Sequence, residues 1–225
     1  MAGRWAALPV AEVDTTVRAH YQADQLLARH GVLTKGAVAA ENIPGGFASM
    51  YKVLTTMEEA GRCQRGYFVE SLGGAQFATA STVDRLRSHA DSIDDKQQTL
   101  RALALAATDP ANPYGAALPW PSRGADGDTA HRPGRKAGAL VVLVDGALVW
   151  FVERGGRSLL SFTTDPETSN AAAASLAEMV PRQRVPALLV ERVDGVPVLE
   201  ARESVTVDAL VTAGFSRTPR GLRLR

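Results

Sequence analysis

The sequence predicts an α+β protein in which a small helical unit ending in a β-hairpin precedes a strand-rich unit. Three observations lead to this expectation. Apolar residues recur at helical spacing in the first third of the chain, β-branched runs alternate with Asp-Gly and Gly-Gly pairs in the last third, and a Pro-rich aromatic stretch lies between them. We expect a linker over 1–13, the first unit over 14–81, a helical segment and strap over 82–136 and the second unit over 137–225.

Three short helices open the first unit. The first can be capped by Asp14 and by Thr15 or Thr16, and it runs to about His30, where Gly31 ends it. Thr34 starts a second, short helix, and a Pro-Gly-Gly break precedes a third over 47–60. The apolar residues of the third helix fall on one face, which predicts that this face is core.

A β-hairpin follows the three helices. Residues 64–70 and 75–78 have strand character and are separated by a Leu-Gly-Gly break. Three helices followed by a hairpin is the element order of a winged helix, in which the third helix usually enters the major groove of DNA and the hairpin, or wing, lies on the backbone. The exposed face of the third helix carries one cation, Lys52, and Glu58 and Glu59 follow it. A winged helix used for packing or oligomerisation is therefore the alternative.

The Pro-rich stretch over 106–121 is too apolar for a flexible linker. It contains four prolines together with Tyr114, Leu118 and Trp120, so neither a helix nor a central strand can run through it. Its large apolar side chains favour packing against a folded unit. We call residues 106–121 the strap and expect it to be docked. Between the hairpin and the strap, residues 82–105 predict one or two helices of mixed charge.

The second unit begins with a three-stranded meander over 139–162. Its turns are Asp145-Gly146 and Gly155-Gly156, and its first two strands are apolar without alternation, so both faces of the sheet should be covered. We expect a helix over 168–179, a second hairpin over 187–200, a helix over 205–213 and a final strand. This order of strands and helices favours a small β-barrel-like module with appended helices.

Composition and missing motifs exclude several classes of function. The net charge is +1, so only local clusters of cations can bind a polyanion. Cys63 is the single cysteine and the four histidines are scattered, which predicts no disulfide, no metal site and no cofactor. The chain lacks a phosphate-binding loop, so it has no ATPase of its own. No signal peptide or membrane span is visible, and we expect a cytoplasmic protein.

The candidate site residues are one acid and ten cations. Asp109, in the strap, is the acid best placed for catalysis, although an Asp before Pro is also a common turn starter. In the C-terminal tail, which has no acid after Asp208, arginines without counter-charge predict contacts to phosphates. The predicted nucleic-acid-binding residues are Lys35, Lys52, Arg62, Arg65, Arg132, Arg135, Lys136, Arg217, Arg220 and Arg223.

Several runs of residues, in order, carry a family resemblance. They are GRWAALP, RHGVLTKGAV, PGGFASMYKVL, EEAGRCQRGYFVE, LGGAQFA, ATDPANPYGAALPWP, RPGRKAGALVVLVDG and TPRGLRLR. Together they resemble the C-terminal end of bacterial large helicase-related (Lhr) proteins, superfamily 2 DNA helicases linked to DNA repair. The resemblance covers nearly the whole chain, and because GRWAALP resembles interior sequence of the family, we expect a truncated or split part of a longer protein.

The resemblance implies a C-terminal DNA-binding and assembly module of an ATP-dependent repair helicase. Its partners would be DNA, an upstream helicase core with further winged-helix modules, and other copies of the chain. The same region of the family resembles winged-helix DNA glycosylases, which implies a uracil or damaged-base glycosylase as the alternative. Those enzymes carry a Gln-x-Gln or Gln-x-Asp motif, from which Gln76-Phe77-Ala78 departs. A pure oligomerisation scaffold is the third interpretation.

Overall fold

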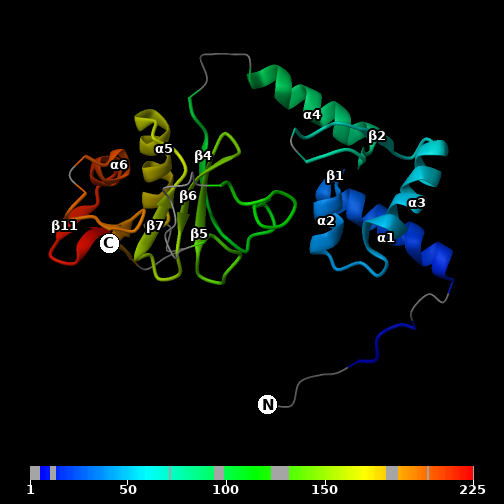
Figure 1. Ribbon diagram of the computed structural model, residues 1–225, viewed down its shortest axis with the longest axis horizontal. Helices are drawn as coiled ribbons and strands as arrows, with labels where there is room; N and C mark the ends of the chain where they lie inside the picture. The colour runs from blue at the N-terminus through cyan, green and yellow to red at the C-terminus, as the bar shows by residue number, and fades with distance from the viewer. Residues whose placement is uncertain are drawn as a thin grey trace. The chain divides into compact units, whose positions relative to one another are not determined.

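The chain folds into two compact units, residues 1–96 and 97–225, each with its own core (Figure 1). The computed structural model describes residues 6–10, 14–70, 72–93, 99–122, 132–180, 187–201 and 203–224.

The first unit has the element order of a winged helix. It contains α1 (Thr15–His30), β1 (Val32–Leu33), α2 (Lys35–Ala40), α3 (Gly46–Glu59), β2 (Gln64–Gly66), β3 (Gln76–Ala78) and α4 (Ala80–Ile93). The three strands form an antiparallel sheet in the order β1-β3-β2. The three helices and the hairpin predicted from the sequence are confirmed. The structure adds β1, which forms the third strand of the sheet beside β3.

Capping residues set the starts of the first two helices. Asp14 Oδ1 accepts hydrogen bonds from the backbone N–H groups of Thr16 (2.7 Å) and Val17 (3.2 Å) at the start of α1. These bonds, led by the one from Val17, hold the pKa of Asp14 below its usual range. Thr34 Oγ1 accepts from the N–H of Ala37 at the start of α2. Both caps satisfy donors that have no partner within the helix.

The core of the first unit lies between α1, α3 and the sheet. The buried residues of α3 are Met50, Leu54 and Met57, which confirms the apolar face predicted for this helix. Phe77 of β3 is fully buried, and its ring meets that of Tyr51 edge to face at 5.7 Å. The packing of α3 against the hairpin therefore fixes where the wing leaves the helical body.

The second unit is built on an open six-stranded sheet. Its strands are β4 (Ala102–Ala106), β5 (Leu140–Val144), β6 (Ala147–Val152), β7 (Ser158–Ser161), β9 (Arg192–Val193) and β10 (Val196–Pro197), in the order β10-β9-β7-β6-β5-β4. At the β5–β6 turn, both Asp145 and Gly146 have positive φ, the conformation of a type I′ hairpin turn. The described strands end in two edges, β10 and β4, so the expected barrel is not confirmed.

Helices and the strap cover opposite faces of this sheet. On one face, Trp150, Val152 and Leu159 pack with buried residues of α5 (Pro166–Ala177) and α6 (Val205–Thr212). On the other face, a second cluster that includes Phe151 and Leu160 packs against Tyr114 and Trp120 of the strap. This arrangement explains why β5 and β6 lack the polar alternation of a half-exposed sheet. Figure 1 shows α5 beside the sheet.

Three segments of the second unit differ from the sequence-based expectation. Residues 102–105, predicted to be helical, belong to β4, which pairs with β5 in an antiparallel ladder. The hairpin predicted over 187–200 is confirmed at its Asp194-Gly195 turn, where β9 pairs with β10, but its first strand is divided between two sheets, because β8 (Leu188–Val190) pairs with β12 whereas β9 also pairs with β7. The expected single final strand is a hairpin of β11 (Ser216–Thr218) and β12 (Gly221–Leu224).

Candidate nucleic-acid interface

Helix α3 presents a mixed polar face on the side away from its buried residues. Lys52 and Thr56 are exposed, whereas Ser49 and Val53 are half-buried. The Thr56 hydroxyl donates to the Lys52 carbonyl oxygen at 3.2 Å, so it is tied to the helix backbone. Lys35, the first residue of α2, is also exposed. Within the described residues, neither of these two lysines forms an ion pair, which leaves their charge available to a polyanion.

Arg62 and Arg65 lie at the base of the wing and both form ion pairs. Arg62 donates through Nη2 to both carboxylate oxygens of Asp24 at 2.7 and 2.9 Å. Arg65 Nη2 lies 3.1 Å from Glu58 Oε2, and the backbone N–H of Arg65 donates to Glu58 Oε1. The arginine side chains are 49% and 42% exposed, respectively. Each guanidinium therefore has surface left for a phosphate but already has an acidic partner.

The position of Arg65 is further fixed by aromatic rings. Its guanidinium carbon lies 5.8 Å from the ring centroid of Tyr51 and 6.0 Å from that of Phe77, and Nη1 donates to the Tyr51 hydroxyl. Such stacking adds cation–π attraction to the ion pair with Glu58. Arg65 thus joins the wing to α3, a structural role that the sequence did not reveal.

Gln76 holds the loop of the wing. Its side-chain oxygen accepts from the backbone N–H groups of Phe68 (3.0 Å) and Val69 (2.8 Å). Its amide nitrogen donates to the carbonyl oxygens of Val69 (2.8 Å) and Gly73 (3.0 Å). Both donors of the amide are therefore in use, and its oxygen accepts twice. Gln76 is only 1% exposed. In the sequence it stands in a glycosylase-like motif, and in the structure it holds the wing loop.

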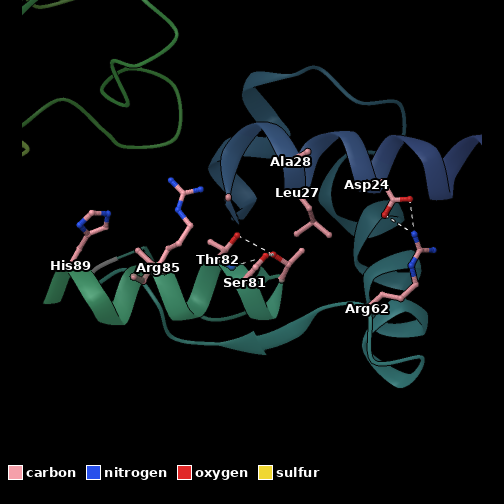
Figure 2. A pocket seen from close by; sticks show the side chains of 11 residues that line it. Asp24, Leu27, Ala28, Arg62, Ser81, Thr82, Arg85 and His89 are labelled. Atoms are coloured by element: carbon pink, nitrogen blue, oxygen red, sulfur yellow. Dashed lines mark hydrogen bonds and ion pairs between the residues drawn. The ribbon is translucent and has the colours of Figure 1, made fainter. Parts of the chain in front are cut away.

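A pocket of about 440 Å³ lies between α1 and α4 (Figure 2). The Asp24–Arg62 ion pair stands at one end, and Arg85 and His89 of α4 stand at the other. The Thr79 hydroxyl, at the start of α4, lies 3.0 Å from the Thr82 hydroxyl. The pocket was not predicted from the sequence, because its lining comes from three separated segments of the chain.

Asp109 takes part in a turn of the strap. Its Oδ1 accepts from the backbone N–H of Ala111 at 2.8 Å, two residues ahead, and its carbonyl oxygen accepts from the N–H of Asn112 at 3.0 Å. This is the pattern of an Asx turn. The structure therefore gives the predicted catalytic acid a turn-forming contact, and its catalytic role stays a prediction.

Arg135 binds the backbone of the strap. Its Nη1 donates to the carbonyl oxygens of Asn112 (2.7 Å) and Tyr114 (3.4 Å), and its Nη2 donates to those of Thr108 (3.2 Å) and Asp109 (3.1 Å). The fork of a guanidinium suits such multiple contacts. These bonds use the guanidinium of Arg135 to hold the strap. Its neighbour Lys136 lies 3.5 Å from Glu153, and Arg132 is exposed.

The cations near the C-terminus do not gather on one face. Arg217 is opposite Leu222 in the β11–β12 ladder, whereas Arg223 is opposite Ser216. Residues directly opposite each other share a face and successive residues alternate, so Arg217 and Arg223 lie on opposite faces of this sheet. Arg220 has an acidic neighbour after all, since its Nη2 lies 3.5 Å from Glu191 Oε1. Arg225 lies outside the described residues, as does His131.

Metal and thiol chemistry find no support in the described part of the chain. No group of three His, Cys, Asp or Glu side chains there could hold a metal ion. Cys63 is buried, donates its S–H to the Leu54 carbonyl oxygen, and has a pKa raised first by burial and then by the charge of Glu58. Among the described helices, none is long and apolar enough to cross a membrane.

Residues 12–98 match a family model described as "Large helicase-related protein, winged-helix domain", so the first unit is a winged-helix domain. The chain is 66% identical to a protein of Mycolicibacterium smegmatis named "Lhr helicase/ probable uracil glycosylase", over 100% of this chain and 15% of that protein. It is 40% identical to an Escherichia coli protein named "Lhr helicase/uracil glycosylase", over 99% of this chain and 14% of that protein.

The chain matches the C-terminal region of bacterial large helicase-related (Lhr) superfamily 2 DNA helicases, which confirms the resemblance seen in its sequence. It spans about one seventh of the length of these two relatives.

Proposed function

We propose that the chain is the C-terminal DNA-binding and assembly module of an ATP-dependent DNA repair helicase and has no ATPase of its own. The observation that carries this proposal is a winged helix, matched to the Lhr family, whose α3 leaves Lys52 and Thr56 exposed. An upstream helicase core would be its partner, and the cytoplasm its compartment.

Binding through this face would be weak and strongly dependent on salt. Four cations of the first unit are candidates for phosphate contacts, and two of them already have acidic partners. Affinity for duplex DNA falls with salt at a logarithmic slope of about −0.9 per phosphate neutralised. We therefore expect a slope of about −2 to −4, smaller than for proteins with extended basic surfaces.

A charge reversal on α3 tests the proposal. Lys52→Glu should weaken binding of a 20-base-pair duplex by about tenfold, as expected for replacing a phosphate attraction by a repulsion. Arg157→Glu, in the second unit, changes the net charge equally and is the matched control, because Arg157 is exposed and outside the proposed face. Fluorescence anisotropy at two salt concentrations measures both. Equal effects of the two variants would contradict a local contact at α3.

A uracil-DNA glycosylase is the second candidate function, favoured by the names of both relatives. In such an enzyme a base is flipped out of the duplex and an acid stabilises the positive charge that develops on the sugar. Asp109 is the acid that we propose for this role. Gln76 is less suited to it, because its amide already makes four hydrogen bonds within the wing.

Cleavage of a uracil-containing oligonucleotide tests the glycosylase. We expect any activity to persist with a chelator and to be lost in Asp109→Asn. Because Asn can keep the acceptor for the Ala111 N–H, this variant separates charge from turn formation. Activity that is retained in a folded Asp109→Asn protein, or abolished by the chelator, refutes the assignment. No activity at all would leave the binding and assembly function as the better supported one.

The assembly part of the proposal concerns other copies of the chain. It rests on the resemblance to the Lhr C-terminal region. Sedimentation velocity over a range of concentrations should show a species larger than the 23.8 kDa monomer. A single monomeric species at all concentrations would remove assembly from the proposal and leave DNA binding.

A further inference from the structure

Tyr67, at the start of the wing loop, is exposed to an unusual degree for an aromatic residue. Its side chain follows β2 directly and is 85% exposed, the largest exposure of any aromatic residue in the described part of the chain. The ring reaches across the loop, since a side-chain carbon placed on Gly74 would lie 3.3 Å from the Tyr67 hydroxyl. Its neighbour Phe68 instead folds back over Gly66 and is half-buried.

Gln76 holds the part of the wing loop that carries Tyr67. The buried amide of Gln76 binds the backbone of Phe68, Val69 and Gly73 through four hydrogen bonds of 2.8 to 3.0 Å. The first of these bonds is made at the residue next to Tyr67. Because the backbone next to Tyr67 is already held by Gln76, a ligand of the ring would not need to order these residues on binding.

The charge of this loop does not suit a phosphate. Residues 67–76 contain no Lys or Arg and one acid, Glu70, which is exposed. A wing that lies on the DNA backbone is expected to carry cations. The exposed ring instead matches the apolar face of a nucleobase, against which aromatic side chains stack. In continuous duplex DNA these faces are covered by neighbouring base pairs, whereas a junction with single strands leaves them accessible.

We propose that Tyr67 stacks on the exposed base at a junction between duplex and single-stranded DNA, so that the wing recognises the junction while α3 holds the duplex. This inference rests on the proposed DNA-binding function and adds the structure of the DNA that is bound. It requires the ring and the fixed loop, but no cation of the wing.

Three variants separate stacking from other effects. Tyr67→Ala removes the ring, Tyr67→Phe keeps it without the hydroxyl, and Tyr21→Ala removes a tyrosine of α1 that is 68% exposed. The probes are a forked DNA with 2-aminopurine at the junction and a covalently closed circular DNA without ends. We expect Tyr67→Ala to bind the fork about tenfold more weakly and the circle almost unchanged, as for the loss of one base stack. The junction preference should remain in Tyr67→Phe and Tyr21→Ala.

The fluorescence of 2-aminopurine gives a readout that affinity alone does not. Stacking on Tyr67 should quench it in the wild-type complex and in Tyr67→Phe, but not in a complex of Tyr67→Ala at saturating protein. Equal affinity of Tyr67→Ala and wild type for the fork, or an equal loss on both DNAs, would overturn the inference. If wild type binds neither DNA, the proposed DNA-binding function fails as well, whereas binding of both DNAs without preference refutes only the junction.

Discussion

Replacing Arg135 with Lys should destabilise the second unit without changing its charge. The guanidinium of Arg135 donates to four carbonyl oxygens of the strap at 2.7 to 3.4 Å. Hydrogen bonds from a charged donor contribute about 1.5 to 3 kcal/mol each when made singly, but these four share one half-buried group. Lys can replace one or two of them and cannot span all four. We therefore expect a loss of about 2 kcal/mol in the free energy of unfolding.

Urea denaturation followed by tryptophan fluorescence measures this loss. Trp120 and Trp150 both belong to the second unit, and a Trp5→Phe background removes the third tryptophan of the chain. Arg132→Lys is the matched control, because Arg132 is an exposed cation three residues before Arg135. If Arg135→Lys unfolds at the same urea concentration as the control, the reasoning about the strap is refuted. If Arg135→Lys lowers the affinity for DNA but leaves the stability unchanged, Arg135 is a nucleic-acid contact, as predicted from the amino-acid sequence.

Three further changes test the packing and the electrostatics. Trp120→Ala should lower the free energy of unfolding by about 2 to 3 kcal/mol, because the half-buried ring stacks on Tyr114 and meets Phe151 edge to face at 5.7 Å. An unchanged melting temperature would show that the strap does not stabilise the sheet. Gly115→Ala should destabilise by at least about 1 kcal/mol, since φ is +74° and the added carbon would lie 2.5 Å from Trp120 Nε1, whereas the matched Ala116→Gly should not create this clash. Glu41→Gln should lower the free energy of unfolding by up to about 1 kcal/mol at neutral pH, because Arg29 and then His30 hold the pKa of Glu41 below its usual 4.5. A lowered pKa stabilises the fold above that pH, so the difference in stability between the variant and wild type should shrink as acid is added. The opposite trend would contradict the ion pair.

Much of the first unit could be predicted from local signals. Caps such as Asp14 and Thr34 and breakers such as Gly31 act within a few residues, so the sequence shows where the helices begin and end. The same holds for the hairpin at Asp145-Gly146, whose turn needs residues that tolerate positive φ. The order of the elements then sufficed to predict a winged helix.

The second unit depends more on pairing between distant segments. The sequence ALALA of β4 contains only strong helix formers, yet it forms a strand because β5 offers it a complete ladder of backbone partners. Likewise, the chain changes sheets at Glu191, between β8 and β9, without a local breaker. Local propensity could not show either result.

The sequence did not reveal the partners of those arginines that contact groups far away in the chain. Arg62 is 38 residues from Asp24, and Arg135 reaches carbonyl groups more than twenty residues before it. Counting acids near each arginine cannot detect such contacts. Lys52 could be placed correctly on an exposed face, because helical periodicity alone determines that face.

The burial of Cys63 makes the chain convenient for chemical labelling. It is the single cysteine of the sequence, its sulfur lies in the core of the winged helix, and its raised pKa keeps the reactive thiolate scarce. A cysteine introduced at an exposed position, for example Tyr21→Cys on α1, would therefore react with a maleimide dye while the native thiol stays unmodified. A fluorophore or crosslinker could then be placed at chosen points of the surface without first replacing a residue of the core.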